Sequence, residues 1–316
     1  MIINILLLVA GLVILILGGD FLVRGASSIA LRLHISPLVV GLTIVAFGTS
    51  APELLISVKS ALAGSPDLTM GNIVGSNICN LALVLGITAL IEPIKVQADS
   101  IKIDWPVAMG SSLLLYFVIQ DKLIGGIEGI IFLSILFMYT TFIIIRSRKE
   151  TKAIRDIEED AGMPDGAGKN IWKDLVYLAI GALGLYYGSE WFVGGAQDLA
   201  RYLGVSERVI GITVLALGTS LPELVTAIVA SVKKETDLAL GNLMGSNIFN
   251  VLSILGITSL ITEIEVSQTI IVHDMIPMLG VTLLVLPMML TGRTVGRVEG
   301  GILLIVYLFY TYTVVS

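Results

Sequence analysis

The sequence predicts an all-α membrane protein with ten transmembrane helices, arranged as two inverted five-helix repeats. Hydrophobic residues make up 55% of the 316 residues and charged residues only 14%, and the mean hydropathy is +0.95. A water-soluble fold lacks the polar surface to cover so much apolar side chain. In addition, the second half of the chain repeats motifs of the first half at a constant offset of 170 residues.

Ten stretches are apolar and long enough to cross the hydrocarbon core, which takes about 20 helical residues. They lie at 2–23, 37–62, 69–91, 104–120, 124–145, 172–194, 207–231, 239–262, 272–291 and 297–315. The second, third, seventh and eighth are interrupted by clusters of Gly, Ser, Asn and Pro. The runs are continuous rather than alternating, which argues against a transmembrane β-barrel. The first has no basic residue before Arg24 and no polar cleavage region after it, so we expect a retained helix rather than a signal peptide.

The distribution of basic residues predicts the orientation. With the N-terminus outside, the cytoplasmic loops carry 15 of the 19 Lys and Arg residues, and the outer loops carry four. Cytoplasmic loops of membrane proteins are enriched in Lys and Arg. We therefore expect both the N- and the C-terminus outside.

The chain is an internal duplication. Residues 41–90 align with residues 211–260 without a gap, and 23 of the 50 positions are identical. Each half holds five spans, an odd number, so the halves must have opposite orientations in the membrane. We expect a first repeat over 1–146, a cytoplasmic linker loop over 147–171 and a second, inverted repeat over 172–316. Inverted repeats with interrupted helices are typical of secondary transporters, whose site lies at the membrane midplane.

Two glutamates, Glu53 and Glu223, lie deep within predicted spans, each after the sequence Gly-Thr-Ser-x-Pro. A charge at the centre of a membrane helix costs at least about 2.5–3.5 kcal/mol, so partners or a wet cavity must offset it. Proline removes an amide hydrogen and clashes with the carbonyl four residues earlier, which frees the oxygens of Gly48 and Gly218. We expect carbonyls around 46–49 and 216–219 to face a ligand, because unpaired backbone at this depth must face protein or a cavity.

A second motif, Gly-Asn-x-x-Gly-Ser-Asn-Ile-x-Asn, starts at Gly71 and again at Gly241. Its glycine pairs Gly71/Gly75 and Gly241/Gly245 are small-xxx-small patterns, which we expect to let these helices pack closely against the interrupted ones. The candidate ligands are hard oxygen donors, which suit Ca²⁺ and Na⁺ and disfavour zinc or copper. The motif adds hydroxyl and amide oxygens from Ser76, Asn80, Ser246 and Asn250.

Other chemistries are poorly represented in the sequence. Cys79 is the only cysteine, which excludes a disulfide framework and a multi-cysteine metal site, and two histidines are too few for most histidine-based sites. A net charge of −6 and a pI near 5.0 give no support for nucleic-acid binding. We therefore expect no cofactor, no nucleic-acid partner and no obligate protein partner, with the lipid bilayer as the surroundings.

The paired Gly-Thr-Ser-(Ala/Leu)-Pro-Glu-Leu and Gly-Ser-Asn-Ile-x-Asn motifs resemble the two alpha-repeats of the sodium/calcium exchanger family, within the cation/calcium antiporter superfamily. The resemblance implies that Glu53 and Glu223 bind Ca²⁺ with the backbone oxygens of Thr49 and Thr219. It also implies two flanking Na⁺ sites and a middle position. One Na⁺ site would use Ser50, Ser246, Glu223 and the Ala46 carbonyl, its mate would use Ser220, Ser76, Glu53 and the Ala216 carbonyl, and Asn80 and Asn250 would line the middle.

The same resemblance implies a transporter rather than an enzyme, with Ca²⁺ and Na⁺ as the transported ions. Exchange would be electrogenic, three Na⁺ for one Ca²⁺, by alternating access, with the first and sixth helices sliding across the other eight. Some relatives, including potassium-dependent exchangers, carry Asp at the position of Asn250. Because both middle positions are neutral here, we predict potassium-independent transport.

Three alternatives stay open. H⁺/Ca²⁺ antiport is the closest, since buried carboxylates can carry protons, but the paired serine hydroxyls favour Na⁺. An intramembrane protease would need a catalytic set, and the Gly19-Asp20 pair has Glu190 rather than Asp at its counterpart, with no Ser–His arrangement. A channel would differ from an exchanger in lacking uphill flux. Short loops and the absence of a large cytoplasmic domain favour a prokaryotic plasma membrane.

Overall fold

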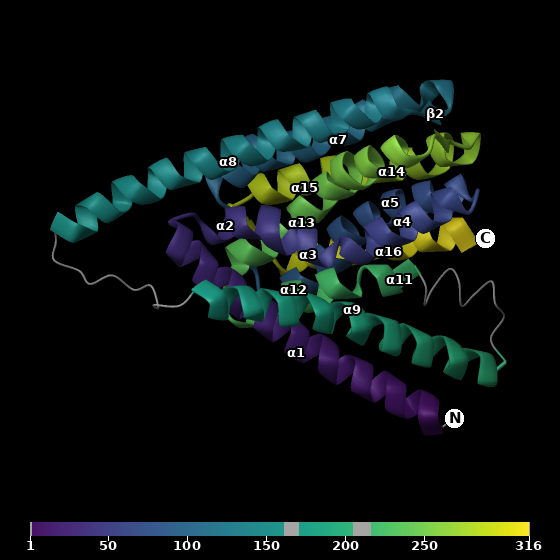
Figure 1. The fold of residues 1–316 in the computed structure, drawn as a ribbon, viewed down its shortest axis with the longest axis horizontal. Coiled ribbons are helices and arrows are strands. Elements are labelled where there is room, and N and C mark those ends of the chain that lie inside the picture. Colours follow the sequence, from purple (N-terminus) through teal and green to yellow (C-terminus); the bar gives the residue numbers. More distant parts are fainter. Residues whose placement is uncertain (1, 161–170, 205–215, 316) are drawn as a thin grey trace.

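The computed structural model describes residues 2–160, 171–204 and 216–315, and helices dominate it (Figure 1). The first half comprises α1 (Ile2–Leu33), α2 (Pro37–Val40), η1 (Gly41–Val45), α3 (Ala46–Thr49), α4 (Ala51–Leu62), α5 (Pro66–Ile78), η2 (Cys79–Val84), α6 (Leu85–Ile91), β1 (Ile94–Lys95), η3 (Ser100–Asp104), α7 (Trp105–Val118), η4 (Ile119–Asp121), β2 (Leu123–Ile124) and α8 (Gly126–Asp160). The second half comprises α9 (Ile171–Tyr202), α11 (Ala216–Thr219), α12 (Leu221–Val232), α13 (Thr236–Phe249), η6 (Asn250–Ile254), α14 (Leu255–Ile261), β3 (Ile264–Glu265), η7 (Ile270–Asp274), α15 (Met275–Leu290), β4 (Thr294–Val295) and α16 (Arg297–Val315).

The apolar helices follow the predicted spans. Among the described residues, seven helices are long and apolar enough to cross a membrane, and the bent pair Pro37–Thr49 with Ala51–Leu62 raises the number to eight. The seven coincide with the predicted spans 1, 3, 4, 5, 8, 9 and 10, and the bent pair is the second span. The sixth predicted span lies within α9. The seventh begins in residues 205–215, outside the described part, and continues as α11 and α12.

Helix boundaries differ from the predicted ones at the peripheral helices. α1 extends to Leu33 rather than 23, and α8 extends to Asp160, so the first part of the predicted linker loop continues as helix. Residues 161–170 of that linker lie outside the described residues. Charged side chains follow the apolar stretches in both helices. Polar residues with good helix propensity can continue a helix beyond an apolar span, and hydropathy alone does not mark where it ends.

Helices α1 and α9 run antiparallel along one edge of the molecule (Figure 1). Gly11, Gly18 and Gly25 of α1 alternate with Gly181, Gly188 and Gly195 of α9. A Cβ at Gly18 would stand 2.7 Å from the backbone nitrogen of Leu185, and one at Gly181 would stand 2.5 Å from that of Leu22. The seven-residue glycine spacing therefore lets the two backbones approach closely, as small residues do between membrane helices. Because α1 and α9 are equivalent in the two repeats, their antiparallel arrangement shows that these elements are inverted.

Two short strand pairs, which the all-α prediction did not include, join the repeats to each other. β1 pairs antiparallel with β4, placing Ile94 opposite Val295, and β2 pairs antiparallel with β3, placing Ile124 opposite Ile264. β1 and β3 are equivalents at the 170-residue offset, and each pairs with a strand of the other repeat. Each pair connects two loops for which the charge distribution predicts a common side of the membrane: the cytoplasmic side for β1 and β4, and the outer side for β2 and β3.

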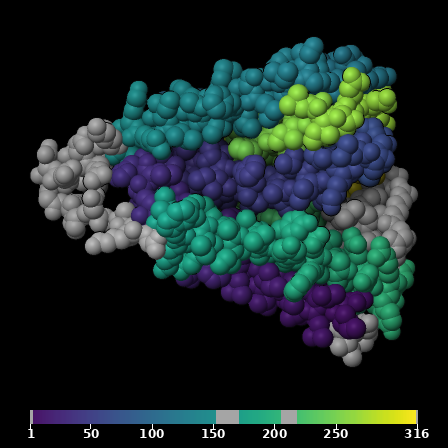
Figure 2. All heavy atoms as spheres, in the orientation of Figure 1, coloured from purple at the N-terminus to yellow at the C-terminus, as the bar shows by residue number. Residues whose placement is uncertain are grey.

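The core of the molecule is formed by the two continuous helical runs Pro66–Ile91 and Thr236–Ile261, whose most apolar windows are each 78% buried. The other apolar spans bury only 11–39% of their most apolar windows, as the outer helices of a protein surrounded by lipid would. On the face seen in Figure 2, the blue-violet band of α2–α4 lies between α9 and the teal band of α8. The interrupted second span thus packs in the middle of the bundle.

The predicted interruptions take two forms. The second span bends by 45° at Ser50, two residues before Pro52, whose nitrogen cannot donate a helical hydrogen bond. The third and eighth spans do not break, contrary to a simple reading of their glycines and asparagines. They continue as helix but widen into π-helical turns at Cys79–Val84 and Asn250–Ile254. Such turns are frequent at functional sites because they reposition the side chains at their start.

Candidate functional site

Glu53 and Glu223 occupy the first turn of α4 and α12, directly after the interruptions at Ser50 and Ser220. Both residues are 0% exposed. Their carboxylates lie near enough to each other to interact electrostatically. The chain therefore places two acidic groups together in its interior, an arrangement that needs cations, protons or hydrogen-bond donors to offset the lost hydration.

The Glu223 carboxylate is hydrogen-bonded by one serine from each repeat. Ser50 Oγ and Ser246 Oγ each donate to Glu223 Oε1 at 3.3 Å. Both serines are buried. Two of the other groups predicted for one Na⁺ site thus contact Glu223, and Ser50 reaches it because the first repeat folds against the second.

Thr49 and the Ala46 carbonyl complete this side of the site. The Thr49 hydroxyl donates to Asn242 Oδ1 at 3.0 Å and lies 3.4 Å from Ser246 Oγ. The Ala46 carbonyl oxygen lies 3.3 Å from the same hydroxyl and accepts the amide of Ser50 at 2.9 Å. The carbonyl predicted as a ligand is therefore adjacent to the predicted side chains.

The Glu53 side of the site has fewer contacts. Among the described residues, neither carboxylate oxygen of Glu53 has a hydrogen-bond partner, and the Ser220 hydroxyl and both amide atoms of Asn80 are also unpaired. All three residues are at most 1% exposed, and Ser76 is 3% exposed. Of the groups predicted for the second Na⁺ site, Glu53, Ser220 and Ser76 are buried, and no hydrogen bond among these three is found in the described part of the chain.

The remaining predicted residues lie at the edges of this arrangement. Thr219 is half-buried and Ala216 is the first residue of α11, directly after residues 205–215, which lie outside the described part. α11 contacts α5, the helix that carries Ser76. Asn80 and Asn250 stand in the two π-helical turns and are 0% exposed.

The sequence prediction missed several asparagines of the second motif. Asn77 and Asn247 each donate through Nδ2 to the other's backbone carbonyl at 3.2 Å. Asn242 holds Thr49, whereas its counterpart Asn72 donates to the backbone oxygen of Glu53 at 3.2 Å. The signal was present, since all these asparagines repeat at the 170-residue offset.

Two small cavities border the helices around the site. One of about 10 Å³ has Ser50 and Ser253 in its lining, beside the Phe47–Phe249 ring pair at 6.3 Å. A volume near this size holds about one water molecule. It gives the Glu223 side of the site a small adjoining space.

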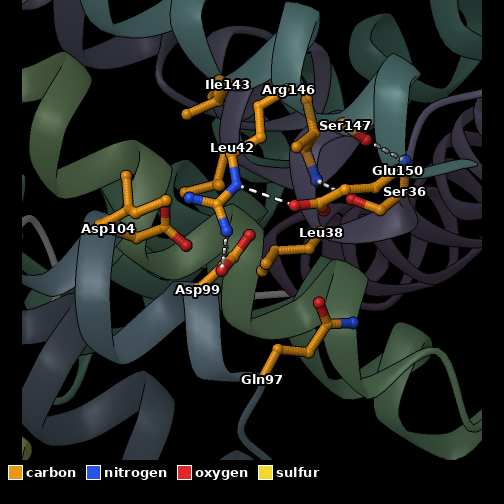
Figure 3. A pocket seen from close by; sticks show the side chains of 12 residues that line it. Ser36, Leu38, Leu42, Gln97, Asp99, Asp104, Ile143, Arg146, Ser147 and Glu150 are labelled. Carbon is orange, nitrogen blue, oxygen red and sulfur yellow. Dashed lines mark hydrogen bonds and ion pairs between the residues drawn. The ribbon is translucent and has the colours of Figure 1, made fainter.

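The other cavity, of about 50 Å³, is separate from the site, since none of the twelve predicted residues lines it. There Arg146 donates to Asp99 at 2.7 Å and to Glu150 at 2.9 Å (Figure 3). Asp104 accepts a hydrogen bond from the Tyr139 hydroxyl at 2.9 Å. At this cavity an ion pair joins Arg146 of α8 to Asp99, directly before η3, and the Ser36 amide, directly before α2, donates to Ser147 Oγ of α8 at 2.8 Å.

Comparison with known proteins identifies the family. The model of the sodium/calcium exchanger protein family matches residues 3–145 and 173–316. The chain belongs to the sodium/calcium exchanger family. It is 37% identical over 322 residues to CaxA of Alkalimonas amylolytica, and the alignment covers 100% of both chains. It is 31% identical over 340 residues to the sodium/calcium exchanger MaX1 of Methanosarcina acetivorans, covering 98% of this chain and 97% of MaX1.

Solved structures of the sodium-calcium exchanger NCX_Mj share the fold. One, soaked with zero Na⁺ and Ca²⁺, superposes with a TM-score of 0.84 at 30% identity and covers 99% of both chains. Another, soaked with 10 mM Na⁺ and 10 mM Sr²⁺, gives 0.83 at 30% identity and covers 100% of this chain and 98% of the other. The chain is therefore a multi-pass membrane transporter of the exchanger family, with helical transmembrane segments.

Proposed function

We propose that this exchanger carries Ca²⁺ in one direction and Na⁺ in the other through the site between Glu53 and Glu223. The observation that carries the proposal is the pair of fully buried carboxylates, one from each repeat, surrounded by hydroxyl, amide and carbonyl oxygens. Two negative charges balance one Ca²⁺, and hard oxygen ligands suit both ions. The name of MaX1, a sodium/calcium exchanger, supports the same ions.

The twelve predicted residues divide into four positions in this proposal: a Ca²⁺ site, two Na⁺ sites and a middle position. Ca²⁺ binds between the two glutamates, with the backbone oxygens of Thr49 and Thr219. One Na⁺ binds at Ser50, Ser246, Glu223 and the Ala46 carbonyl, and a second at the mirror set Ser220, Ser76, Glu53 and the Ala216 carbonyl, with Asn80 and Asn250 in the middle. The hydrogen bonds from Ser50 and Ser246 to Glu223 support the first Na⁺ position, because hydroxyls that converge on one carboxylate oxygen can turn their own oxygens toward a cation.

The oxygens of Glu53, Ser220 and Asn80 that have no hydrogen-bond partner among the described residues are also of the type that binds Ca²⁺ and Na⁺. Buried polar atoms without partners are costly, so a protein that retains several of them in one place has a ligand to satisfy them. Among the described residues, groups of three or more His, Cys, Asp and Glu that could hold a metal ion are absent. A low-charge site of this kind suits ions that must bind and leave, whereas a site with more acidic groups would retain them.

We further propose that exchange is electrogenic, with three Na⁺ per Ca²⁺, independent of K⁺, and that it proceeds by alternating access. Asn250 is neutral where potassium-dependent relatives carry Asp, which supports independence from K⁺. The ten-span topology with both termini outside, the repeats at 1–146 and 172–316, and a prokaryotic plasma membrane location belong to the same proposal. The pairing of β1 with β4 and of β2 with β3 supports the assignment of these loops to common sides.

The test is ion flux in reconstituted liposomes. Liposomes loaded with Na⁺ are diluted into Na⁺-free choline buffer, and uptake of radiolabelled Ca²⁺ is followed, with equal Na⁺ on both sides as the control. We expect uptake that depends on the Na⁺ gradient, that an inside-positive potential increases, and that K⁺ does not alter. Loss of Ca²⁺ uptake in both Glu53→Gln and Glu223→Gln supports the assigned site. Uptake retained in both variants would contradict the assignment.

A second function, H⁺/Ca²⁺ antiport, is favoured by the lack of hydrogen-bond donors at Glu53 among the described residues. A buried carboxylate without partners can be neutralised by a proton as well as by a cation. A parallel set of liposomes that carries only a pH gradient distinguishes the two functions. Ca²⁺ uptake driven by that gradient alone would retain the two glutamates and replace Na⁺ with H⁺.

A further inference from the structure

Asn77 of α5 and Asn247 of α13 lie where these two helices contact each other. They are 2% and 4% exposed. Each side chain donates from Nδ2 to the backbone carbonyl of the other at 3.2 Å. The pair is reciprocal because the two residues are equivalents in the repeats, so it marks the approximate symmetry axis between them.

These bonds determine which way each amide points. A backbone carbonyl can only accept a hydrogen bond, so the nitrogen of each amide must face the other helix and its oxygen must face away. The Oδ1 atom of Asn77 then accepts from Nδ2 of Asn250 at 3.0 Å. Since an amide oxygen can only accept, Asn250 must present its nitrogen there. The orientation of an amide, ordinarily ambiguous, is fixed here by a chain of obligatory acceptors.

The consequence is an oriented oxygen at position 250. With its nitrogen held by Asn77, Asn250 directs Oδ1 away from that bond, and this buried oxygen has no partner among the described residues. A carboxylate at position 250 would face the Asn77 oxygen and be repelled by it. Asn77 therefore both orients the amide of Asn250 and favours a neutral residue there.

The equivalent bond in the first repeat is not made. Oδ1 of Asn247 and both amide atoms of Asn80 have no hydrogen-bond partner in the described part of the chain. The bond from Asn250 Nδ2 to Asn77 Oδ1 has as its repeat equivalent a bond from Asn80 Nδ2 to Asn247 Oδ1. The two middle asparagines are thus in different states, one oriented and one not.

We propose that Asn77 is a positioning residue for ion binding, acting through Asn250, whose side-chain oxygen it directs toward the transported cation. By repeat equivalence, Asn247 would take the same role toward Asn80 in a form in which that bond is made. This inference rests on the proposed function of the site, and it adds two residues outside the twelve predicted ligands.

The test is a double-mutant cycle on direct ion binding. Equilibrium binding of ⁴⁵Ca²⁺ to the purified full-length protein in Na⁺-free detergent buffer is measured for wild type, Asn77→Ser, Asn250→Ala and the double variant. Each single change is expected to weaken Ca²⁺ binding roughly five- to tenfold, the effect of one hydrogen bond. Because Asn77 acts through Asn250, the double variant is expected to bind as Asn250→Ala does.

A matched cycle combines Asn77→Ser with Asn80→Ala, and here the two fold-changes are expected to multiply. If they multiply equally in both cycles, or if Asn77→Ser lowers thermal stability without changing the Kd, Asn77 has only a structural role and the inference is overturned. Wild-type protein that shows no Ca²⁺ binding dependent on Glu53 and Glu223 would overturn the proposed function, and the inference with it. The two failures are therefore distinguishable.

Discussion

The two carboxylates of the site have equivalent positions in the repeats but different surroundings. Glu223 accepts hydrogen bonds from Ser50 and Ser246, whereas Glu53 has no hydrogen-bond partner among the described residues. The asparagines beside them differ in the same sense. Asn242 contacts Thr49 of the other repeat, and Asn72 contacts Ser57 of its own repeat at 3.0 Å. One half of the site is thus assembled across the repeat interface, and the other is not.

Helix packing has the same asymmetry. Gly241 and Gly245 of α13 lie against α2 and η1, as predicted, and a Cβ at Gly245 would stand 2.7 Å from Leu42 Cα. Gly71 and Gly75 of α5 have no neighbour within 4 Å of a built Cβ among the described residues. Close packing at this motif is therefore described for α13; the second-repeat equivalents of α2 and η1, residues 207–215, lie outside the described part of the chain.

The largest effect is expected from the glutamates themselves. Glu53→Gln and Glu223→Gln each remove one of the two charges that hold Ca²⁺, so Ca²⁺ uptake should fall by more than the roughly 10–100-fold that loss of an outer partner costs a metal site. The comparison is sharpened by thermal stability in ion-free buffer. Glu223→Gln weakens two charge-assisted hydrogen bonds, so it should lower the melting temperature in that buffer. Glu53→Gln removes an unpaired buried charge, so the melting temperature should stay equal or rise. Equal destabilisation by both changes would show that the two halves are equivalent.

The next effect concerns the glycine pairs. Gly245→Ala forces a methyl group against the backbone of η1 and is expected to destabilise the protein by about 1–3 kcal/mol. Gly75→Ala, the matched control in the other repeat, meets no atom within 4 Å among the described residues and should change stability by less than about 0.5 kcal/mol. Denaturation of the purified protein, followed by circular dichroism, measures both. Similar losses from the two changes would contradict the observed difference in packing.

A somewhat smaller loss of stability is expected from a change in α9. Ser189 Oγ donates at 2.7 Å to the carbonyl of Gly218, the oxygen that Pro222 leaves without its helical partner. Ser189→Ala leaves this buried acceptor unpaired and should cost about 1–2 kcal/mol. Its repeat counterpart is Gly19, which has no side chain to bind Gly48. Thermal unfolding of Ser189→Ala against the neutral change Gly194→Ala, at an open position, checks this; no shift relative to Gly194→Ala counts against the bond.

The smallest effect separates the serines before the two prolines. Ser50→Ala removes one donor to Glu223 and should lower stability in ion-free buffer by about 1 kcal/mol. Ser220→Ala removes a hydroxyl without a partner among the described residues and should be close to neutral. Both changes should raise the Na⁺ concentration needed for half-maximal exchange, if both serines bind Na⁺. A larger stability loss for Ser220→Ala than for Ser50→Ala would reverse the assignment of the assembled half.

Much of the fold was predictable because it follows from local chemistry. Apolar runs of about 20 residues predict spans, and the proline after Gly-Thr-Ser predicts the bend at Ser50. Boundaries were less predictable, as the extension of α8 to Asp160 illustrates, because a helix can continue beyond the apolar stretch. The strand pairs were not predicted, since two-residue strands carry no periodic signal and depend on a partner about 140 to 200 residues away.

The sequence by itself determined the duplication, the buried glutamates and the oxygen-rich motifs, because each is a property of residue type and spacing. Only the tertiary structure decided which of two identical motifs is hydrogen-bonded. It joined Ser50 of one repeat to Glu223 of the other, and it turned Asn250 toward Asn77. The physical reason is that equivalent sequences cannot specify different environments. The difference arises from neighbours outside the motifs, such as Ser189 opposite Gly19, and from the packing of one repeat against the other.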